Sequence, residues 1–292
     1  DKFDVRWASR GEDGEIVYEL SGALHVYDTK TKSDRELSIF VPDDGVSSRP
    51  SRVDVGRSIE DFGLAPKGER VVASARGDVF TLPIEKGNTR NLTNSSSAHD
   101  RVARWSPDGK KIAFVSDRTG EEQVWLVDQD GGGKPEALTT DRKERLTNLL
   151  WSPDGKSLVL TDKSGRIWAL DVASKALTAV ARDLSGNVGD TAWSPDSKWL
   201  AFSLGEANAF RSVNVWSAET KQVTRVTDPL WNATEPIWDP NGNYLYYLSD
   251  REYAPQLMGL EWNFCANRTT SIYAVALRKD VPHPFPPESD EV

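Results

Sequence analysis

The sequence has few of the side chains that form disulfides, metal centres or nucleophilic catalytic sites. Its 292 residues include one cysteine, one methionine and three histidines. The lone cysteine, Cys265, cannot pair within the chain and cannot supply a thiolate zinc site. It is compatible with a reducing compartment, so we expect a cytoplasmic location, with the periplasm as the alternative.

The three histidines leave little room for a catalytic triad. A serine nucleophile needs a histidine within hydrogen-bonding distance, and His25, His99 and His283 are scattered along the sequence. We interpret His99 as a solvated pore or rim residue. The segment 128–133 begins like a calcium loop but lacks the later ligands, and we predict a hairpin turn there. No catalytic residue, metal or cofactor is therefore expected.

Long apolar runs and an excess of positive charge are also missing. No run approaches the roughly 20 apolar residues that a membrane-spanning helix requires. The 36 Lys and Arg residues are outnumbered by 45 Asp and Glu residues, which gives a net charge of −9. Phosphate binding requires a concentrated basic face. We therefore expect neither nucleic acid nor a membrane as a partner.

What the sequence does contain is a repeat centred on tryptophan. Eleven tryptophans are present, and five of them occupy the anchor of a Trp-Ser-Pro-Asp-Gly repeat or of a weaker version of it. From residue 64 onward, consecutive anchors are 41, 46, 42 and 45 residues apart. This spacing is typical of four-stranded propeller blades. The six anchors are Trp7, Leu64, Trp105, Trp151, Trp193 and Trp238.

The anchor and the turn after it have a physical basis. Proline fixes φ at about −65° in the second turn position, aspartate suits the third, and glycine accepts the positive φ that follows. We interpret the anchor tryptophans as packing between blades rather than as an aromatic platform for a ligand. Trp125, Trp168 and Trp216 recur on third strands.

Each repeat is predicted to form a series of short strands rich in Val, Ile, Leu, Trp and Tyr. The sequence shows no sustained helical periodicity. We predict an all-β fold, a β-propeller of four-stranded antiparallel blades over residues 1–280. Six blades are recognisable and seven are possible, and the last blade is incomplete. Second strands are expected at 111–116, 157–162, 199–204 and 244–249, third strands at 123–128, 166–171, 213–218 and 271–277, and fourth strands at 90–93, 135–139 and 222–227.

Two segments interrupt the repeat, 40–57 and 250–270. The second carries the apolar side chains of Met258, Leu260, Trp262 and Phe264. Such side chains are costly to leave in water, so they either cover the flank of the propeller or dock a neighbouring domain. The last repeat lacks a fourth strand, and we expect the Pro-rich segment 281–292 to be a linker to a downstream domain. Because the sequence begins without an initiator methionine, we also expect it to be part of a longer polypeptide.

The blades resemble the propeller repeats of the TolB and tricorn group. Segments near both ends are more specific than the blade motif itself, and the resemblance covers essentially the whole chain. Asp61–Gly68, Ala75–Phe80 and Thr89–Thr93 are similar to the opening of the second propeller of tricorn-type serine peptidases. Glu261–Phe264, Ile272–Asp280 and Pro284–Glu291 are similar to its exit.

In that family, two propellers precede a mixed domain, a PDZ domain and a peptidase domain with a serine nucleophile. The resemblance implies a non-catalytic propeller of a serine peptidase, acting as scaffold and as channel or filter for peptides during proteolysis. It also implies that the other domains of the parent are partners and that the parent is a homo-oligomer. Second propellers of the family have seven blades. No peptidase motif matches this chain, so no catalytic residue is carried over.

If this chain carries function itself, we expect it where the first strands enter the central channel. A ring of mixed charge there could orient peptide termini, or the same residues could be solvated without selectivity. Two alternatives stay open: a TolB-like propeller that recruits a protein partner, and a propeller enzyme with an acidic or histidine cluster in its channel. The channel-mouth candidates are Glu60, Asp61, Asp100, Arg101, Glu144, Arg145, Asp190, Thr234 and Glu235.

Overall fold

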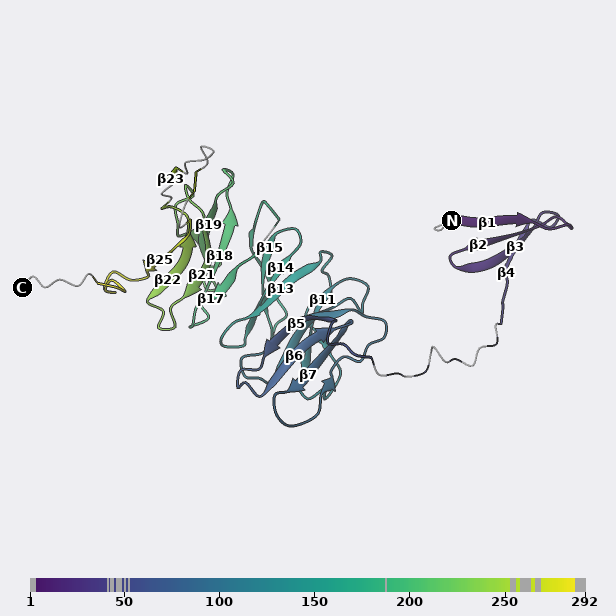
Figure 1. The fold of residues 1–292 in the computed structure, drawn as a ribbon, viewed down its shortest axis with the longest axis horizontal. Coiled ribbons are helices and arrows are strands. Elements are labelled where there is room, and N and C mark those ends of the chain that lie inside the picture. Colours follow the sequence, from purple (N-terminus) through teal and green to yellow (C-terminus); the bar gives the residue numbers. More distant parts are fainter. Residues whose placement is uncertain are drawn as a thin grey trace, which may run out of the picture. The chain divides into compact units, whose positions relative to one another are not determined.

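The structure, a computed structural model, describes residues 4–40, 42, 45, 49, 51, 53–186, 188–252 and 269–286, together with the backbone of 256–257 and 264–265. Within these residues every regular element is a β-strand, which confirms the predicted all-β class. The chain forms two compact units, Asp1–Val53 and Asp54–Val292. Figure 1 labels strands of both units.

The first unit is one four-stranded antiparallel sheet. Its strands lie in chain order: β1 (Val5–Arg10), β2 (Glu15–Leu20), β3 (Ala23–Asp28) and β4 (Ser33–Glu36). The turn after β1 is closed by a hydrogen bond from the Gly11 amide to the Glu15 carbonyl, so Arg10 is the residue before the turn. Trp7 lies instead at a bulge, with a φ of 55°. Trp7 therefore stands three residues before the anchor position that the sequence pattern assigned to it.

Among the described residues, the second unit contains five antiparallel sheets of three or four strands, each named by its first strand. In every sheet, neighbours in sequence are neighbours in space, and Figure 1 shows the sheets following one another in chain order. The sheets are β5 (Ile59–Leu64), β6 (Arg70–Ala75), β7 (Asp78–Pro83) and β8 (Arg90–Asn91); β9 (Asp100–Trp105), β10 (Lys111–Ser116), β11 (Gln123–Asp128) and β12 (Glu136–Ala137); β13 (Leu146–Trp151), β14 (Ser157–Asp162), β15 (Arg166–Asp171) and β16 (Leu177–Arg182); β17 (Thr191–Trp193), β18 (Trp199–Gly205), β19 (Arg211–Ser217) and β20 (Val223–Arg225); and β21 (Ala233–Trp238), β22 (Tyr244–Ser249) and β25 (Ser271–Ala276). A separate short pair, β23 (Gln256–Leu257) and β24 (Phe264–Cys265), lies between β22 and β25 in the sequence.

The predicted boundaries hold best for the second and third strands. The predicted segments 111–116, 157–162 and 244–249 are found as β10, β14 and β22. The fourth strands are shorter than predicted, since β12 retains Glu136–Ala137 of the expected 135–139. The β21 sheet has no fourth strand among the described residues, as the sequence indicated.

Two predictions on domain organisation are not tested by the described residues. One is that the first sheet joins the other sheets in a single propeller over residues 1–280. The other is that residues 281–292 link to a downstream domain, and residues 287–292 lie outside the described part of the chain. Both stay predictions.

The Ser-Pro-Asp-Gly turns follow the mechanism expected from their residue types. Ser106 Oγ donates to Asp108 Oδ1 at 2.6 Å and accepts from the Lys111 amide at 3.0 Å. The Gly109 amide donates to the Ser106 carbonyl at 2.9 Å, and Gly109 has a φ of 71°. The same contacts recur in the turns at 152–157 and 194–199. The turn therefore supplies its own partners and fixes the spacing between the first and second strands.

Substituting Gly109 with alanine tests this geometry. A Cβ would meet only the ring of Pro66, with Cδ at 3.7 Å and Cγ at 4.0 Å, both ordinary contacts, so the strain comes from the left-handed backbone alone. We expect Gly109→Ala to lower the free energy of unfolding by about 1–2 kcal/mol, measured by urea denaturation. Gly189, whose φ is not in the left-handed region and whose Cβ position is open, is the control. Equal effects at both positions would contradict the account.

The core of the second unit lies between its sheets rather than inside any one of them. Four buried apolar clusters form, one at each contact between neighbouring sheets. Between the β5 and β9 sheets, for example, Val72 and Val79 pack against Ile112 and Phe114. Each internal sheet therefore buries both of its faces, one against the preceding sheet and one against the following sheet.

The anchor tryptophans connect these layers. The indole N–H of Trp105 donates to the Gly63 carbonyl at 3.2 Å. Trp151 donates to the Arg104 carbonyl at 3.2 Å, and Trp238 donates to the Ala192 carbonyl at 2.9 Å. In all three cases the acceptor is the residue just before the anchor of the preceding sheet. This confirms that Trp105, Trp151 and Trp238 pack between blades.

Replacing Trp151 with phenylalanine removes this bond while it keeps an aromatic ring. Trp151 is buried, so the Arg104 carbonyl would lose its indole donor in the interior. We expect a loss of about 1–3 kcal/mol in the free energy of unfolding, measured by chemical denaturation. Trp199 is 42% exposed, and Trp199→Phe should change stability by less than about 0.5 kcal/mol. A loss at residue 199 as large as that at residue 151 would contradict this assignment.

Candidate functional site at the first strands

The first strands of neighbouring sheets lie next to one another, and one arginine connects three of them. Arg104 on β9 forms an ion pair with Asp61 on β5. Its other terminal nitrogen is 3.4 Å from Asn148 Oδ1 on β13. The three side chains are half-buried. They form a row of charged and polar side chains along the first strands. We call the edge formed by β5, β9, β13, β17 and β21 the first-strand edge.

Bulges in the first strands change the direction of backbone groups at this edge. Val102 on β9 has a φ of 52° and Glu235 on β21 has a φ of 53°, and the pairing register shifts around both residues. A bulge inserts one residue and redirects its neighbours. At Glu235, the amide is directed toward the preceding sheet, where it meets Asp190.

A charged pair fixes the start of β13. Arg101 Nη2 is 2.6 Å from both carboxylate oxygens of Glu122 and donates to the Leu146 carbonyl at 2.5 Å. Glu122 Oε2 accepts from the Leu146 amide at 2.7 Å. Both polar backbone groups of Leu146 are therefore held by the β9 sheet. Arg101 is therefore a structural tie between sheets, and its predicted place at a channel mouth stays a prediction.

Asp100 is also turned inward. Its carboxylate is fully buried and accepts from Arg118 Nη2 at 3.0 and 3.1 Å. The Arg118 guanidinium lies 4.8 Å from the ring centre of Trp125. A buried carboxylate held by a guanidinium within its own sheet stabilises that sheet and is not available to a ligand.

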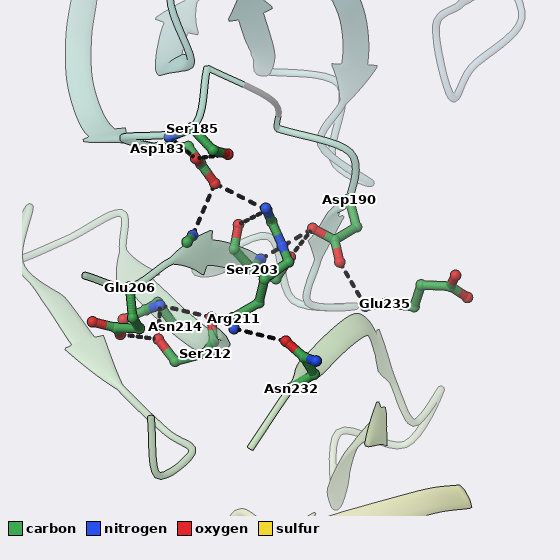
Figure 2. A network of polar contacts seen from close by, with 11 residues as sticks. Asp183, Ser185, Asp190, Ser203, Glu206, Arg211, Ser212, Asn214, Asn232 and Glu235 are labelled. Carbon is green, nitrogen blue, oxygen red and sulfur yellow. Dashed lines mark hydrogen bonds and ion pairs between the residues drawn. The ribbon is translucent and has the colours of Figure 1, made fainter. Parts of the chain in front are cut away.

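An extended polar network joins the β13, β17 and β21 sheets (Figure 2). Asp190, just before β17, accepts from the Ser203 hydroxyl at 2.6 Å and from the Glu235 amide at 2.5 Å. Arg211 donates to Ser203 Oγ at 3.2 Å and to Asp183 Oδ2 at 2.9 Å. Figure 2 shows these groups pointing toward one another, while the Glu235 side chain points away from the network.

Asp183 is the buried charge of this network. Burial of its carboxylate raises the pKa, but hydrogen bonds from Ser185 and the Gly205 amide, with the Arg211 charge, outweigh that effect. The pKa of Asp183 therefore lies below its ordinary value of 3.8. The ionised form is favoured in the folded state. This carboxylate anchors Arg211 and is not a proton donor.

The predicted channel-mouth residues divide into two groups. Asp61, Asp100, Arg101 and Asp190 are bonded within or between sheets, as described above. Most of the others face solvent: Glu60 Oε1 is 3.6 Å from His99 Nε2, and both side chains are about half exposed. Glu144 and Arg145 are exposed in the connection before β13. Thr234 is half-buried on β21 next to the exposed Glu235.

The predicted domain-docking residues cannot be placed. Met258, Leu260 and Trp262 lie outside the described residues, and of Phe264 only the backbone in β24 is described. Docking by this segment stays a prediction.

Several of the residues that hold this edge together were not found from the sequence. Arg104, Asn148, Glu122, Asp183 and Arg211 carry contacts described above. The partners in the Arg101–Glu122, Arg104–Asn148 and Arg211–Asp183 contacts are 21 to 44 residues apart in the sequence. One signal was present: Ser116-Asp117-Arg118 recurs as Ser249-Asp250-Arg251. In both copies, the aspartate accepts a hydrogen bond from the backbone amide of the residue just before the first strand of its own sheet. Asp117 accepts from His99, and Asp250 accepts from Asn232.

No group of three or more His, Cys, Asp or Glu side chains among the described residues is placed to hold a metal ion. The described part of the chain also has no helix that is long and apolar enough to cross a membrane.

Antiparallel sheets that pack face to face, with first strands side by side, define a β-propeller domain. A family profile described as the tricorn protease second beta propeller domain matches residues 59–292. The chain therefore belongs to the family of tricorn protease second β-propeller domains.

The similarity to individual proteins is distant but extensive. A tricorn protease homolog of Saccharolobus solfataricus is 26% identical over 94% of this chain and 25% of its own length. Tricorn protease of Thermoplasma volcanium is 24% identical over 96% of this chain and 28% of its own length. The chain thus spans about a quarter of these relatives.

Two solved structures show the same fold. The crystal structure of the tricorn protease matches with a TM-score of 0.73 at 18% identity, over 97% of this chain and 28% of that one. The structure of putative TolB from Agrobacterium tumefaciens matches with a TM-score of 0.52 at 16% identity, over 87% and 84%. The predicted TolB-like architecture is confirmed by this likeness.

Replacing Asp183 with asparagine tests the network of Figure 2. Removing one partner of a buried charge pair costs about 3–5 kcal/mol, so Asp183→Asn should lower the free energy of unfolding by about 3 kcal/mol at pH 7. Because the pKa of Asp183 is lowered in the folded state, its stabilisation is present above pH 4 and lost as the pH falls through the folded value.

The variant should therefore lose part of the pH dependence of stability on the acid side, measured by urea denaturation between about pH 2 and pH 7. The exposed Asp141 provides the control substitution, Asp141→Asn. An unchanged pH dependence in Asp183→Asn would contradict the assignment.

Proposed function

We propose that this chain is the non-catalytic propeller of a tricorn-type serine peptidase, where it serves as scaffold and as a passage or filter for peptides. Family membership supports the parent activity. The chain's own geometry supports a passive role, because the buried charged side chains of the first-strand edge are bonded within or between sheets rather than arranged around a free nucleophile. In this proposal the partners are peptides and the other domains of the parent.

One observation carries the passage role. Charged side chains at the first-strand edge fall into a fixed set and a solvent-facing set. Arg104 is held between Asp61 and Asn148, while Glu60 and Glu235 are exposed. Fixed charges beside a narrow path bias the entry of charged ligands through the local field, and this effect falls with ionic strength. The exposed carboxylates are the groups that a passing peptide would meet.

The test is peptide hydrolysis by the longer polypeptide that carries this chain. Glu60→Gln and Glu235→Gln together should raise kcat/KM for acidic peptides by about threefold or more relative to neutral peptides of equal length, since two repulsive charges are removed. The difference should shrink when salt is raised to about 0.5 M. Glu219→Gln, an exposed carboxylate in the turn between β19 and β20, is the control.

Two results would contradict the proposal. One is equal kcat/KM ratios for acidic and neutral peptides in all variants. The other is hydrolysis by this chain alone that a substitution at the first-strand edge abolishes, which would favour a propeller enzyme. A longer polypeptide without peptidase activity would favour the TolB-like alternative, a propeller that recruits a protein partner.

A further inference from the structure

Two sheets of the second unit carry an arginine at the same position. Arg118 and Arg251 each lie two residues after the second strand of their sheet. The Arg118 guanidinium lies 4.8 Å from the ring centre of Trp125. The Arg251 guanidinium lies 4.1 Å from the ring centre of Tyr273. Each ring belongs to the third residue of the third strand, so the two arginines are held against equivalent rings.

The two arginines differ in their partners. Arg118 Nη2 donates to both oxygens of the buried Asp100 carboxylate, at 3.1 and 3.0 Å. Asp100 stands at the start of β9, and the pairing register places Ala233 at the same point of β21. Alanine supplies no side-chain acceptor, and within the part of the chain that the structure describes Arg251 forms no ion pair. Its guanidinium donates instead to the Tyr247 hydroxyl.

A cavity lies beside Arg251, and Ala233 forms part of its wall. Its volume is about 350 Å³, and Tyr247 and Ser249 also line it. These three wall residues are buried, whereas Arg251 and the lining Trp231 are exposed, so the cavity is open to solvent. Pockets that bind small molecules have volumes of about 300–1,000 Å³. The missing carboxylate of the β21 sheet is therefore replaced by a space large enough for a small ligand.

Two carboxylates lie near this cavity, and neither forms an ion pair with Arg251. Asp228 lines the cavity, and its Oδ1 accepts from the Leu230 amide at 3.0 Å. Glu252 acts on the Tyr273 hydroxyl, whose pKa is raised by burial and by the Glu252 charge. The negative charge of Asp228 opposes the entry of an anion, and its removal provides a further variant for the test.

We propose that the cavity beside Arg251 binds a carboxylate ligand, which occupies the place that the Asp100 carboxylate has beside Arg118. A guanidinium presents its N–H donors in one plane and forms paired hydrogen bonds with a carboxylate. The Tyr273 ring holds that plane in a fixed orientation. The Tyr247 hydroxyl accepts from Arg251 and keeps its own proton for a second acceptor.

The carboxylate has two sources with the same chemistry. One is the free carboxylate of a small molecule or of a peptide end, and the other is an acidic side chain of a longer polypeptide that carries this chain. The inference goes beyond the proposed function and does not depend on it. A binding experiment on the 292-residue chain tests the site, and the same experiment on the longer polypeptide separates the two sources.

Titration with N-acetyl-dialanine and with its C-terminal amide, followed by NMR, tests the proposal. The two probes differ only in the charged group. In the 292-residue chain, the acid should bind at least about tenfold more tightly than the amide, because a hydrogen bond to a charged group is stronger than a neutral one. Arg251→Gln should remove this preference. Arg182→Gln, a substitution of an exposed arginine that does not line the cavity, is the matched control and should keep it.

Two further variants change the charge inside the cavity. Ala233→Asp supplies a carboxylate from within the sheet, as Asp100 does in the β9 sheet, and should abolish binding of the acid probe. Circular dichroism checks that this variant is folded, and Arg251→Gln decides the question if it is not. Asp228→Asn should tighten binding of the acid by about threefold, and less at high salt, because a repulsive charge is removed.

Equal affinities for the acid and the amide would overturn the proposal, and so would an unchanged preference in Arg251→Gln. In the longer polypeptide, the Nε proton of Arg251 reports the occupant. A shift that matches that of Ala233→Asp without any probe identifies an acidic side chain as the source. A shift that appears only with the acid probe identifies a free carboxylate, and no shift in either case would overturn the proposal. None of these measurements involves peptide hydrolysis, so the site and the proposed function can fail independently.

Discussion

The packing of one sheet on the next is the constraint on which the rest of this structure depends. No sheet of the second unit has an interior of its own, so each apolar face is buried only if a neighbour covers it. The indole bonds of Trp105, Trp151 and Trp238 join an anchor to a backbone carbonyl of the preceding sheet at three of the four contacts, whereas the buried indole nitrogen of Trp193 has no hydrogen-bond partner. The anchor tryptophans therefore pack between neighbouring sheets, and the repeat in the sequence recurs once per sheet.

Polar groups at the first-strand edge also hold neighbouring sheets together. Arg101 and Glu122 hold both backbone groups of Leu146, and Asp190 holds the amide of Glu235. Buried charges of this kind are stable only when they are paired and hydrogen-bonded. They occupy the region where sequence reasoning expected peptide selectivity. In the proposed function, a passing peptide would meet the exposed set, with Glu60 and Glu235 as its clearest members.

Much of the architecture could be predicted because it depends on short-range signals. The anchor, the turn chemistry and the alternation of apolar residues each act within about ten residues, and they gave the strands β10, β14 and β22 correctly. Trp7 was misplaced by the same reasoning, since a tryptophan near a glycine-containing turn resembles an anchor, while its backbone conformation at a bulge leaves no sign in the residue types. The pairings of Arg101, Arg104 and Arg211 depend on distances across sheets, which spacing along the chain does not encode.

Apolar packing joins neighbouring sheets at all four contacts, and an indole bond accompanies it at three of them. Hydrogen exchange of the indole N–H protons tests most directly whether these contacts stay closed. By NMR, the Trp105, Trp151 and Trp238 indole protons should exchange only through opening of the contact between two sheets, at least 100-fold more slowly than the proton of the exposed Trp199. Exchange of the Trp151 indole proton at the rate of Trp199 would contradict the account.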